Sequence, residues 1–167
     1  LQDMSKWVIG NTSATAANRL KWHKIQDGNK TLLICDRGIL AKVSWDDLNG
    51  QGLITGKTVT IDGQQYKLRV LTGGEEKREG GTGSSYEGGK LPNEWDRYIV
   101  NEAGMSGAPT PVASDLDTTL DVTDKNSTHN QAWNWMGFYS WCQETYKHDS
   151  ANRASRGLNS ARYWNFY

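Results

Sequence analysis

The clearest pattern in the chain is an alternation of apolar and polar residues over 64–71. The apolar positions recur at every second residue, as in a β-strand with one buried face: Tyr66, Leu68 and Val70. Another β-like run, 57–61, comes before it, and the pair Asp62-Gly63 stands between the two. Asp-Gly is favoured in two-residue hairpin turns because both of its residues tolerate positive φ. The sequence therefore predicts a hairpin of 57–61 and 64–71.

Two further elements are predicted from shorter patterns. The β-like runs 31–35 and 39–45 flank Asp36-Arg37-Gly38, which has turn chemistry, and this predicts a second hairpin. A helix is expected over 91–100 because Pro92 opens it and apolar residues follow at helical spacing, with Gly104 as its end.

Two segments are predicted to be loops. Residues 73–89 hold seven glycines and a charged cluster, so we expect a mobile surface loop over about 73–90. Residues 105–131 are rich in Ser, Thr, Asp and Asn, which predicts a long loop. The acids of that loop could bind calcium, but their spacing lacks the glycine and the closing glutamate of an EF-hand; they are Asp115, Asp117, Asp121 and Asp124. A solvated loop without metal is the expectation.

The C-terminal part changes character twice. Residues 131–146 are too dense in aromatic side chains for an exposed loop, which predicts a core segment. Residues 152–167 then mix Arg, Asn and Ser with Tyr, Trp and Phe and show no periodicity. Tyrosine and tryptophan supply rigid contact area and asparagine supplies adaptable hydrogen bonds, so this tail has the composition of a binding surface.

Composition excludes several classes of partner. The 167 residues carry 19 basic and 19 acidic side chains, so no net charge favours nucleic acid or an anionic membrane. No run approaches the roughly 20 apolar residues of a membrane span, and no membrane insertion is expected. The length fits a single domain over 1–167 with an aromatic core, since it holds eight Trp and seven Tyr.

Motifs of catalysis are missing from the sequence. It has no nucleophile elbow, no zinc-protease helix, no dinucleotide fingerprint and no phosphate-binding loop. Cys35 and Cys142 lie far apart without the spacing of a redox or zinc site and are interpreted as buried thiols. We therefore expect no enzyme activity, no catalytic residue, no metal and no cofactor.

Three separated segments, in one order, resemble a known family. Leu91-Pro92-Asn93-Glu94-Trp95 resembles the helix start of formylglycine-generating-enzyme-like proteins, in shortened form. The segments 137–142 (Gly-Phe-Tyr-Ser-Trp-Cys) and 153–157 (Arg-Ala-Ser-Arg-Gly) resemble that family's tryptophan segment and its arginine-glycine strand. The resemblance spans 91–157, about the C-terminal half of the chain.

The resemblance implies an α+β protein with a C-type lectin fold of the formylglycine-generating-enzyme-like subtype, with short antiparallel strands, few helices and long loops. Its members are either oxidases or variable proteins of diversity-generating retroelements from viruses, phages and prokaryotes. The oxidases carry their catalytic cysteines after the arginine-glycine strand, whereas no cysteine follows Cys142 here. The resemblance therefore favours the hypervariable binding proteins.

In that class, mutagenic reverse transcription replaces adenines, so Asn codons at chosen C-terminal positions become Tyr, Phe, Arg, Leu and others. The variable region is expected over about 152–167, and its ligand-binding positions are Leu158, Asn159, Arg162, Tyr163, Asn165, Phe166 and Tyr167. Trp164 lies outside the reachable set and is interpreted as fixed. The variable side chains are expected to point outward while four tryptophans hold the core: Trp133, Trp135, Trp141 and Trp164.

The resulting hypothesis is a non-enzymatic viral protein that binds a receptor, a protein or other cell-surface ligand, through a variable C-terminal surface on a virion or cell surface. Two alternatives stay open: a virion or tail adhesin of fixed specificity, and a formylglycine-generating-type oxidase. Oligomerisation also stays open, since multimers give such binders avidity.

Overall fold

A computed structural model describes residues 2–3, 9–110, 133, 138–158 and 160–167. The chain groups into two compact units, Leu1–Arg69 and Val70–Tyr167. The sequence predicted one domain over the whole chain.

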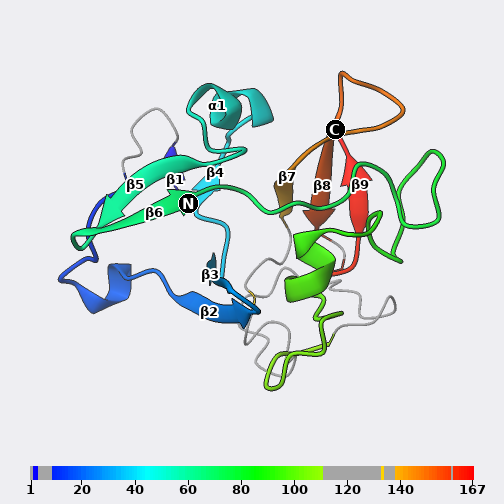
Figure 1. Ribbon diagram of the computed structural model, residues 1–167. Helices are drawn as coiled ribbons and strands as arrows, with labels where there is room; N and C mark the ends of the chain where they lie inside the picture. The colour runs from blue at the N-terminus through cyan, green and yellow to red at the C-terminus, as the bar shows by residue number, and fades with distance from the viewer. Residues whose placement is uncertain (1, 4–8, 111–132, 134–137, 159) are drawn as a thin grey trace. The chain divides into compact units, whose positions relative to one another are not determined.

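Both units consist mainly of small antiparallel sheets with few helices, so the protein belongs to the α+β class (Figure 1). In the first unit the elements are β1 (Gln2–Asp3), η2 (Ala16–Asn18), β2 (Trp22–Asp27), β3 (Lys30–Cys35), β4 (Leu40–Ala41), α1 (Trp45–Gly50), β5 (Lys57–Ile61) and β6 (Gln64–Leu68). In the second unit they are η3 (Trp95–Ile99), β7 (Tyr139–Thr145), β8 (Arg153–Gly157) and β9 (Trp164–Phe166).

The hairpin predicted at Asp62-Gly63 is confirmed. Strands β5 and β6 pair antiparallel from Lys57 opposite Leu68 to Ile61 opposite Gln64. Asp62 and Gly63 have φ of 50° and 78°, the positive values that a primed two-residue turn requires. The second strand ends at Leu68, earlier than predicted.

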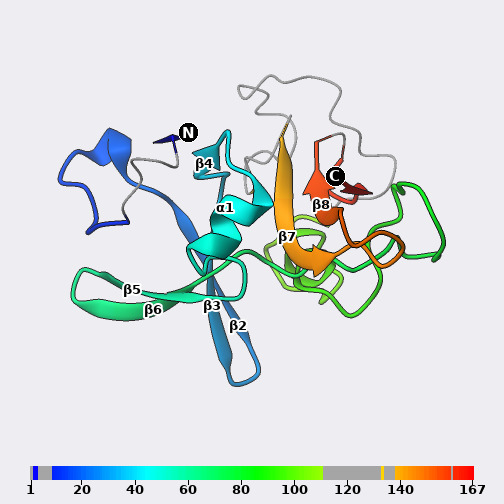
Figure 2. The ribbon, with the colours of Figure 1, turned by 90° about the horizontal axis from the view of Figure 1, so that it is seen from above.

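The hairpin predicted around Asp36-Arg37-Gly38 is wrong. The chain turns at Gly28-Asn29 between β2 and β3, and the two strands pair antiparallel with Asp27 opposite Lys30. They run side by side in Figure 2. Gly28 has φ of 57°, so a glycine takes the left-handed position of this turn. The run after residue 38 contributes only β4, which pairs in parallel with β1. The Gly-Asn pair was the better turn signal.

Helix α1 begins at a capping box. The Ser44 hydroxyl accepts a hydrogen bond from the amide of Asp47, and the Asp47 carboxylate accepts one from the amide of Ser44. These bonds satisfy amide groups that a helix start otherwise leaves unpaired. The hydrogen bonds to Ser44 hold the pKa of Asp47 below its ordinary value. Leu48 is the buried side chain of this short helix.

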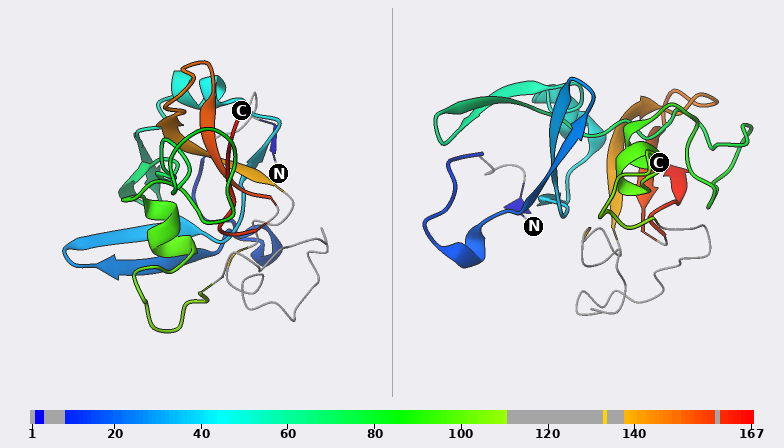
Figure 3. Two further views of the ribbon diagram at one scale, coloured as in Figure 1. Left: turned by 90° about the vertical axis from the view of Figure 1, so that its right-hand side faces the viewer. Right: turned by 60° about the horizontal axis from the view of Figure 1, so that its bottom comes forward.

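The second unit is built around the three-stranded sheet β7-β8-β9, which is antiparallel throughout (Figure 3). Its register shifts between Trp141 and Thr145, where β7 carries an irregularity. The predicted core character of 131–146 holds for Trp133, Cys142 and Tyr146, which are all buried. The sheet places the chain's C-terminal tail on an edge strand.

The helix predicted over 91–100 is shorter and wider than expected. Only Trp95–Ile99 is helical, and the amide of Val100 bonds to the carbonyl of Trp95 five residues back, as in a π-helix. Its N-terminal side is held by Asn93, whose side-chain oxygen accepts the amide of Asp96. The turn buries Trp95, Asp96, Tyr98 and Ile99.

The prediction of a surface loop over 73–90 is wrong for six of its residues, which are buried: Gly73, Gly74, Glu76, Ser85, Gly88 and Gly89. The segment folds back on itself, with the Arg78 amide bonded to the Gly88 carbonyl and the Lys90 amide to the Glu76 carbonyl. Four of its glycines lie where other atoms approach too closely for a side chain: Gly73, Gly74, Gly88 and Gly89. A Cβ at Gly89 would stand 2.0 Å from the carbonyl oxygen of Gly73.

Candidate functional site

Strand β9 separates two kinds of side chain by its alternation. Opposite β8, Phe166 pairs with Ala154, Asn165 with Ser155 and Trp164 with Arg156. Since successive strand residues point to opposite faces, Trp164 and Phe166 share one face of the sheet and Asn165 lies on the other. We call the first the core face.

The core face is packed with aromatic rings. Trp164 is fully buried, and its Nε1 donates a 2.8 Å hydrogen bond to the carbonyl of Gly74. Phe166 stacks on Tyr146 at 4.1 Å between ring centroids, with an interplanar angle of 11°. Cys142 and Ala154 complete this cluster. The expectation that Phe166 points outward is therefore wrong: it packs against the core.

The opposite face carries a group of neutral side chains that we call the tyrosine face: Tyr86, Tyr139, Tyr163, Asn165 and Tyr167. The rings form a continuous row, with centroid separations of 4.5 Å for Tyr86 and Tyr163, 6.3 Å for Tyr139 and Tyr163, and 4.8 Å for Tyr139 and Tyr167. Exposure is highest at the two ends of the row, 38% at Tyr86 and 53% at Tyr167, and is 9% at Tyr163 inside it.

Asn165 connects two of these rings by hydrogen bonds. Its side-chain nitrogen donates to the hydroxyl of Tyr139 at 3.1 Å and to the hydroxyl of Tyr167 at 3.2 Å. Burial raises the pKa of Tyr139, and its hydrogen bond with Tyr167 raises that pKa further, so the phenol stays neutral at physiological pH. The face thus offers aromatic area and polar tips without formal charge.

The row depends on two backbone features. Gly157 lies opposite Tyr139, and its amide donates to the carbonyl of Tyr163, so a residue without a side chain separates the two tyrosines. Tyr86 reaches the sheet because Ser85 bridges β9, exchanging hydrogen bonds of 3.0 and 2.8 Å with Trp164. The bridge sets Tyr86 beside Tyr163.

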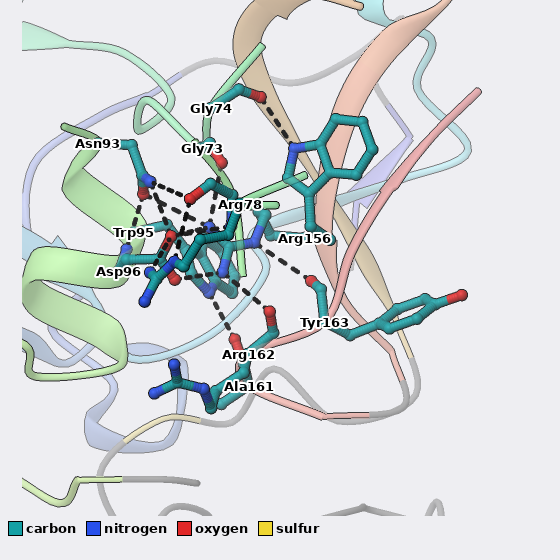
Figure 4. A network of polar contacts seen from close by, with 12 residues as sticks. Gly73, Gly74, Arg78, Asn93, Trp95, Asp96, Arg156, Ala161, Arg162 and Tyr163 are labelled. Carbon is teal, nitrogen blue, oxygen red and sulfur yellow. Dashed lines mark hydrogen bonds and ion pairs between the residues drawn. The ribbon is translucent and has the colours of Figure 1, made fainter. Parts of the chain in front are cut away.

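A buried ion pair lies beneath the core face (Figure 4). Asp96 and Arg156 are both fully buried, and the guanidinium holds both carboxylate oxygens, at 2.5 and 3.0 Å. The amide of Gly89 and the side chain of Asn93 also donate to Asp96. Burial works against the charged form of Asp96, but Arg156, Asn93 and Arg78 together outweigh it, so the pKa of Asp96 lies below its ordinary value.

Arg78 extends this network toward the surface. Its guanidinium lies 3.3 Å from Asp96 and 2.6 Å from Glu102, which also receives Arg162 at 3.3 Å. The same nitrogen of Arg162, Nη2, also donates to the carbonyl of Glu87 at 3.2 Å. Asp96 and Glu102 thus compensate two of the three guanidinium charges of this network.

A separate charge cluster fixes the folded segment 73–90. The Glu76 carboxylate is buried and lies 2.9 Å from Lys147, 3.1 Å from His148 and 3.4 Å from Lys90. The hydrogen bond from Lys147, opposed by burial and assisted by His148 and Lys90, lowers the pKa of Glu76 to about 2. The carboxylate thus ties the glycine-rich segment to the chain between β7 and β8.

This lowered pKa predicts a pH-dependent effect of Glu76→Gln. The charged form stabilises the fold fully above the ordinary pKa of 4.5, and that contribution is lost as the pH falls toward 2. We expect Glu76→Gln to be less stable than the wild type at pH 7 and the two to converge between pH 4.5 and 2. Urea unfolding at four pH values measures this, with the exposed neighbour change Glu75→Gln as control. A difference that stays constant from pH 7 to 2 would refute the role of Glu76.

The sequence-predicted positions are only partly brought together. Tyr163, Asn165 and Tyr167 lie on the tyrosine face, and Arg162 lies beside Tyr163 in the chain with its side chain on Glu102. Leu158 is half-buried at a φ of 72°, and Asn159 lies outside the described residues. Of the tryptophans assigned to the core, Trp133 and Trp164 are buried, Trp141 is half-buried and Trp135 lies outside the described residues.

Three contributing residues were missed by sequence reasoning. Tyr139 could have been recognised, because it lies two residues before Trp141 and therefore on the same face of the strand that this segment forms. Asp96 could also have been recognised, since Arg156 stands among small residues, and an arginine in a buried strand needs a counter-ion. Tyr86 could not, because the Ser85 bridge is a contact between distant parts of the chain.

Within the described residues, nothing indicates metal or thiol chemistry. No group of three or more His, Cys, Asp or Glu side chains there is placed to hold a metal ion. The acidic positions 115–124 considered for calcium lie outside those residues. Cys142 is fully buried, and this burial raises the pKa of its thiol well above the ordinary value. Such a thiol is a poor nucleophile.

A comparison of the chain with known protein families, with curated proteins and with solved structures finds no match in any of the three. Among the described helices, none has the length and apolar character to cross a membrane.

Proposed function

We propose that the protein is a non-enzymatic ligand-binding protein whose tyrosine face contacts a partner on a cell surface. The observation that carries the proposal is the continuous row of four tyrosines around Asn165. Tyrosine provides large contact area with few rotatable bonds, and asparagine adapts its hydrogen bonds to the partner. Tyrosine is also frequent among the residues that contribute most of the binding energy at interfaces.

We further propose that the face is sequence-variable and is diversified by a retroelement. The alternation of β9 supports this, because Tyr163, Asn165 and Tyr167 share the tyrosine face while Trp164 and Phe166 pack against the core. None of the first three side chains belongs to the core cluster of Cys142, Tyr146, Ala154 and Trp164. Phe166 is excluded from the variable set by its packing.

The proposed fold is that of a C-type lectin of the formylglycine-generating-enzyme-like subtype. Its support is the meeting of two of the resembling segments: Trp95, from the first, lies under the Arg156 guanidinium, from the third, at 5.6 Å. The middle segment supplies Tyr139 on β7, the strand next to β8. A fold does not set a function, so the binding proposal rests on the tyrosine face itself.

The binding proposal is tested with the full chain on an array of purified cell-surface proteins and glycans. For the partner retained, we expect Tyr167→Ala and Asn165→Ala each to weaken binding about tenfold or more. The matched control is Tyr66→Ala, which removes a comparably exposed tyrosine from β6 and is expected to change affinity less than about twofold. Loss of binding in the control and not in the face variants would contradict the proposal.

The alternative of a fixed-specificity adhesin uses the same face and differs only in its diversification. Cys142 does not support the oxidase alternative, because its thiol is buried and is protonated at neutral pH.

A further inference from the structure

The turn that leads into β9 is held from below by side chains outside the turn. Trp95 donates from its Nε1 to the carbonyl of Ala161 at 2.7 Å. Arg156 donates from Nη2 to the carbonyl of Arg162 at 3.1 Å and from Nε to the carbonyl of Tyr163 at 3.2 Å. Three successive carbonyl groups therefore receive buried donors (Figure 4).

The amide groups of residues 162 and 163 are held by Ser160. Ser160 accepts the amide of Tyr163 on its carbonyl and the amide of Arg162 on its hydroxyl. Ser160 and Ala161 are themselves buried. The backbone position of the turn is thus set by Ser160, its first residue, and by side chains from η3 and β8.

Arg156 is fully used in this arrangement. Its five N–H groups reach both oxygens of Asp96 and the carbonyls of Gly73, Arg162 and Tyr163. A guanidinium can make these five bonds at fixed angles, whereas a lysine ammonium has three donors on one atom. Asp96 in turn fixes the guanidinium plane.

The side chains of Arg162 and Tyr163 contact other groups than the carbonyls of the turn. Arg162 reaches toward Glu102 and Glu87, and Tyr163 contacts the rings of Tyr86 and Tyr139. Figure 4 shows the Tyr163 ring pointing away from the network that holds its carbonyl. Between described residues, the side-chain donors to the carbonyls of 161–163 are Trp95 and Arg156.

We propose that Trp95, Asp96 and Arg156 form a backbone clamp that keeps the turn 160–163 in one conformation whichever side chains stand at 162 and 163. Within the proposed binding function, on which this rests, the clamp allows the side chains at these two positions to be exchanged, the 9%-exposed Tyr163 included, so that they determine specificity. Trp95 and Arg156 are positioning residues: they act on a ligand only through the turn.

The experiment measures how many side chains the turn accepts. Positions 162 and 163 are randomised in the full chain, displayed on yeast, and sorted for resistance to protease without any ligand. A second library randomises 165, which lies in the β8-β9 ladder, and 167, whose backbone exchanges hydrogen bonds with that of Arg153. Each library is made in the wild type, in Arg156→Lys, in Trp95→Phe and in Val100→Ala. The last is a buried control change outside the clamp.

In the wild type we expect most variants at 162 and 163 to keep the protease resistance of the parent within about threefold. For the 162/163 library, the folded fraction in the Arg156→Lys and Trp95→Phe backgrounds should be at least fivefold lower than in the Val100→Ala background. For the 165/167 library, the folded fraction should be reduced equally in all three backgrounds. Trp95→Phe keeps an aromatic ring but loses the donor to Ala161 and some buried volume, and Val100→Ala controls for the loss of buried volume. Trp95→Phe therefore remains informative if Arg156→Lys does not fold.

Equal tolerance of the 162/163 library across the three altered backgrounds would overturn the clamp, as would a wild-type library that is mostly unfolded. Because protease resistance is read without a ligand, this outcome is separate from failure of the binding proposal. If Tyr167→Ala loses affinity but the 162/163 library is tolerated equally in all three altered backgrounds, the binding face is supported and the clamp is rejected.

Discussion

Asp96→Asn is expected to lower the free energy of unfolding by about 3–5 kcal/mol, the cost typical of breaking a buried ion pair by removing one partner. The change leaves the Arg156 guanidinium charged and fully buried without its counter-ion. Asparagine keeps the volume of the side chain, so the effect reports charge rather than a cavity. Urea unfolding of the full chain at pH 7 gives the value.

The control for this prediction is Glu102→Gln. Glu102 also pairs with arginine, but its side chain is 26% exposed, and a pair of that kind contributes about 0–1 kcal/mol. Similar losses for the two variants would contradict the assignment of Asp96–Arg156 as the buried centre of the second unit.

Trp164→Ala is expected to cost about 3–5 kcal/mol, whereas Tyr167→Ala should cost less than about 1 kcal/mol. Trp164 is fully buried, and its removal leaves a cavity beside Tyr146 and an unsatisfied carbonyl at Gly74. Tyr167 is 53% exposed and loses one ring contact and one hydrogen bond. Thermal and urea unfolding of both variants measures the contrast.

Phe166→Ala gives an internal check on the same strand. Its ring stacks on Tyr146 but remains partly exposed, so the expected loss falls between those of Trp164→Ala and Tyr167→Ala. Equal losses at 164 and 167 would contradict the separation of β9 into a core face and a tyrosine face.

The local parts of the fold were predictable from the sequence. Asp62-Gly63 determines its hairpin through residues adjacent in the chain, and the aromatic density around Cys142 indicated a core segment. The α+β class with short strands followed from such signals together with a family resemblance. The hairpin at Asp36 failed because two turn signals competed, and Gly28 allowed the tighter turn.

The site was less predictable because its contacts join distant residues. The composition of the tail indicated a binding surface, and alternation along β9 could have separated Phe166 from Asn165 had the strand been recognised. The contribution of Tyr86 depends on a bridge to Trp164 that no local pattern encodes. The glycine-rich segment was misjudged for a related reason: glycines that permit close backbone contact resemble, in composition, glycines of a flexible loop.

The central claim is that β9 and the turn before it carry replaceable side chains on a fixed framework. The most direct test is the nucleotide sequence around the coding region, searched for a near-repeat of the segment that encodes 152–167. We predict a repeat beside a reverse transcriptase gene, with mismatches only at template adenines, in codons such as those of Tyr163, Asn165 and Tyr167. Absence of the repeat, or mismatches in the codons of Arg156 and Trp164, would contradict the claim.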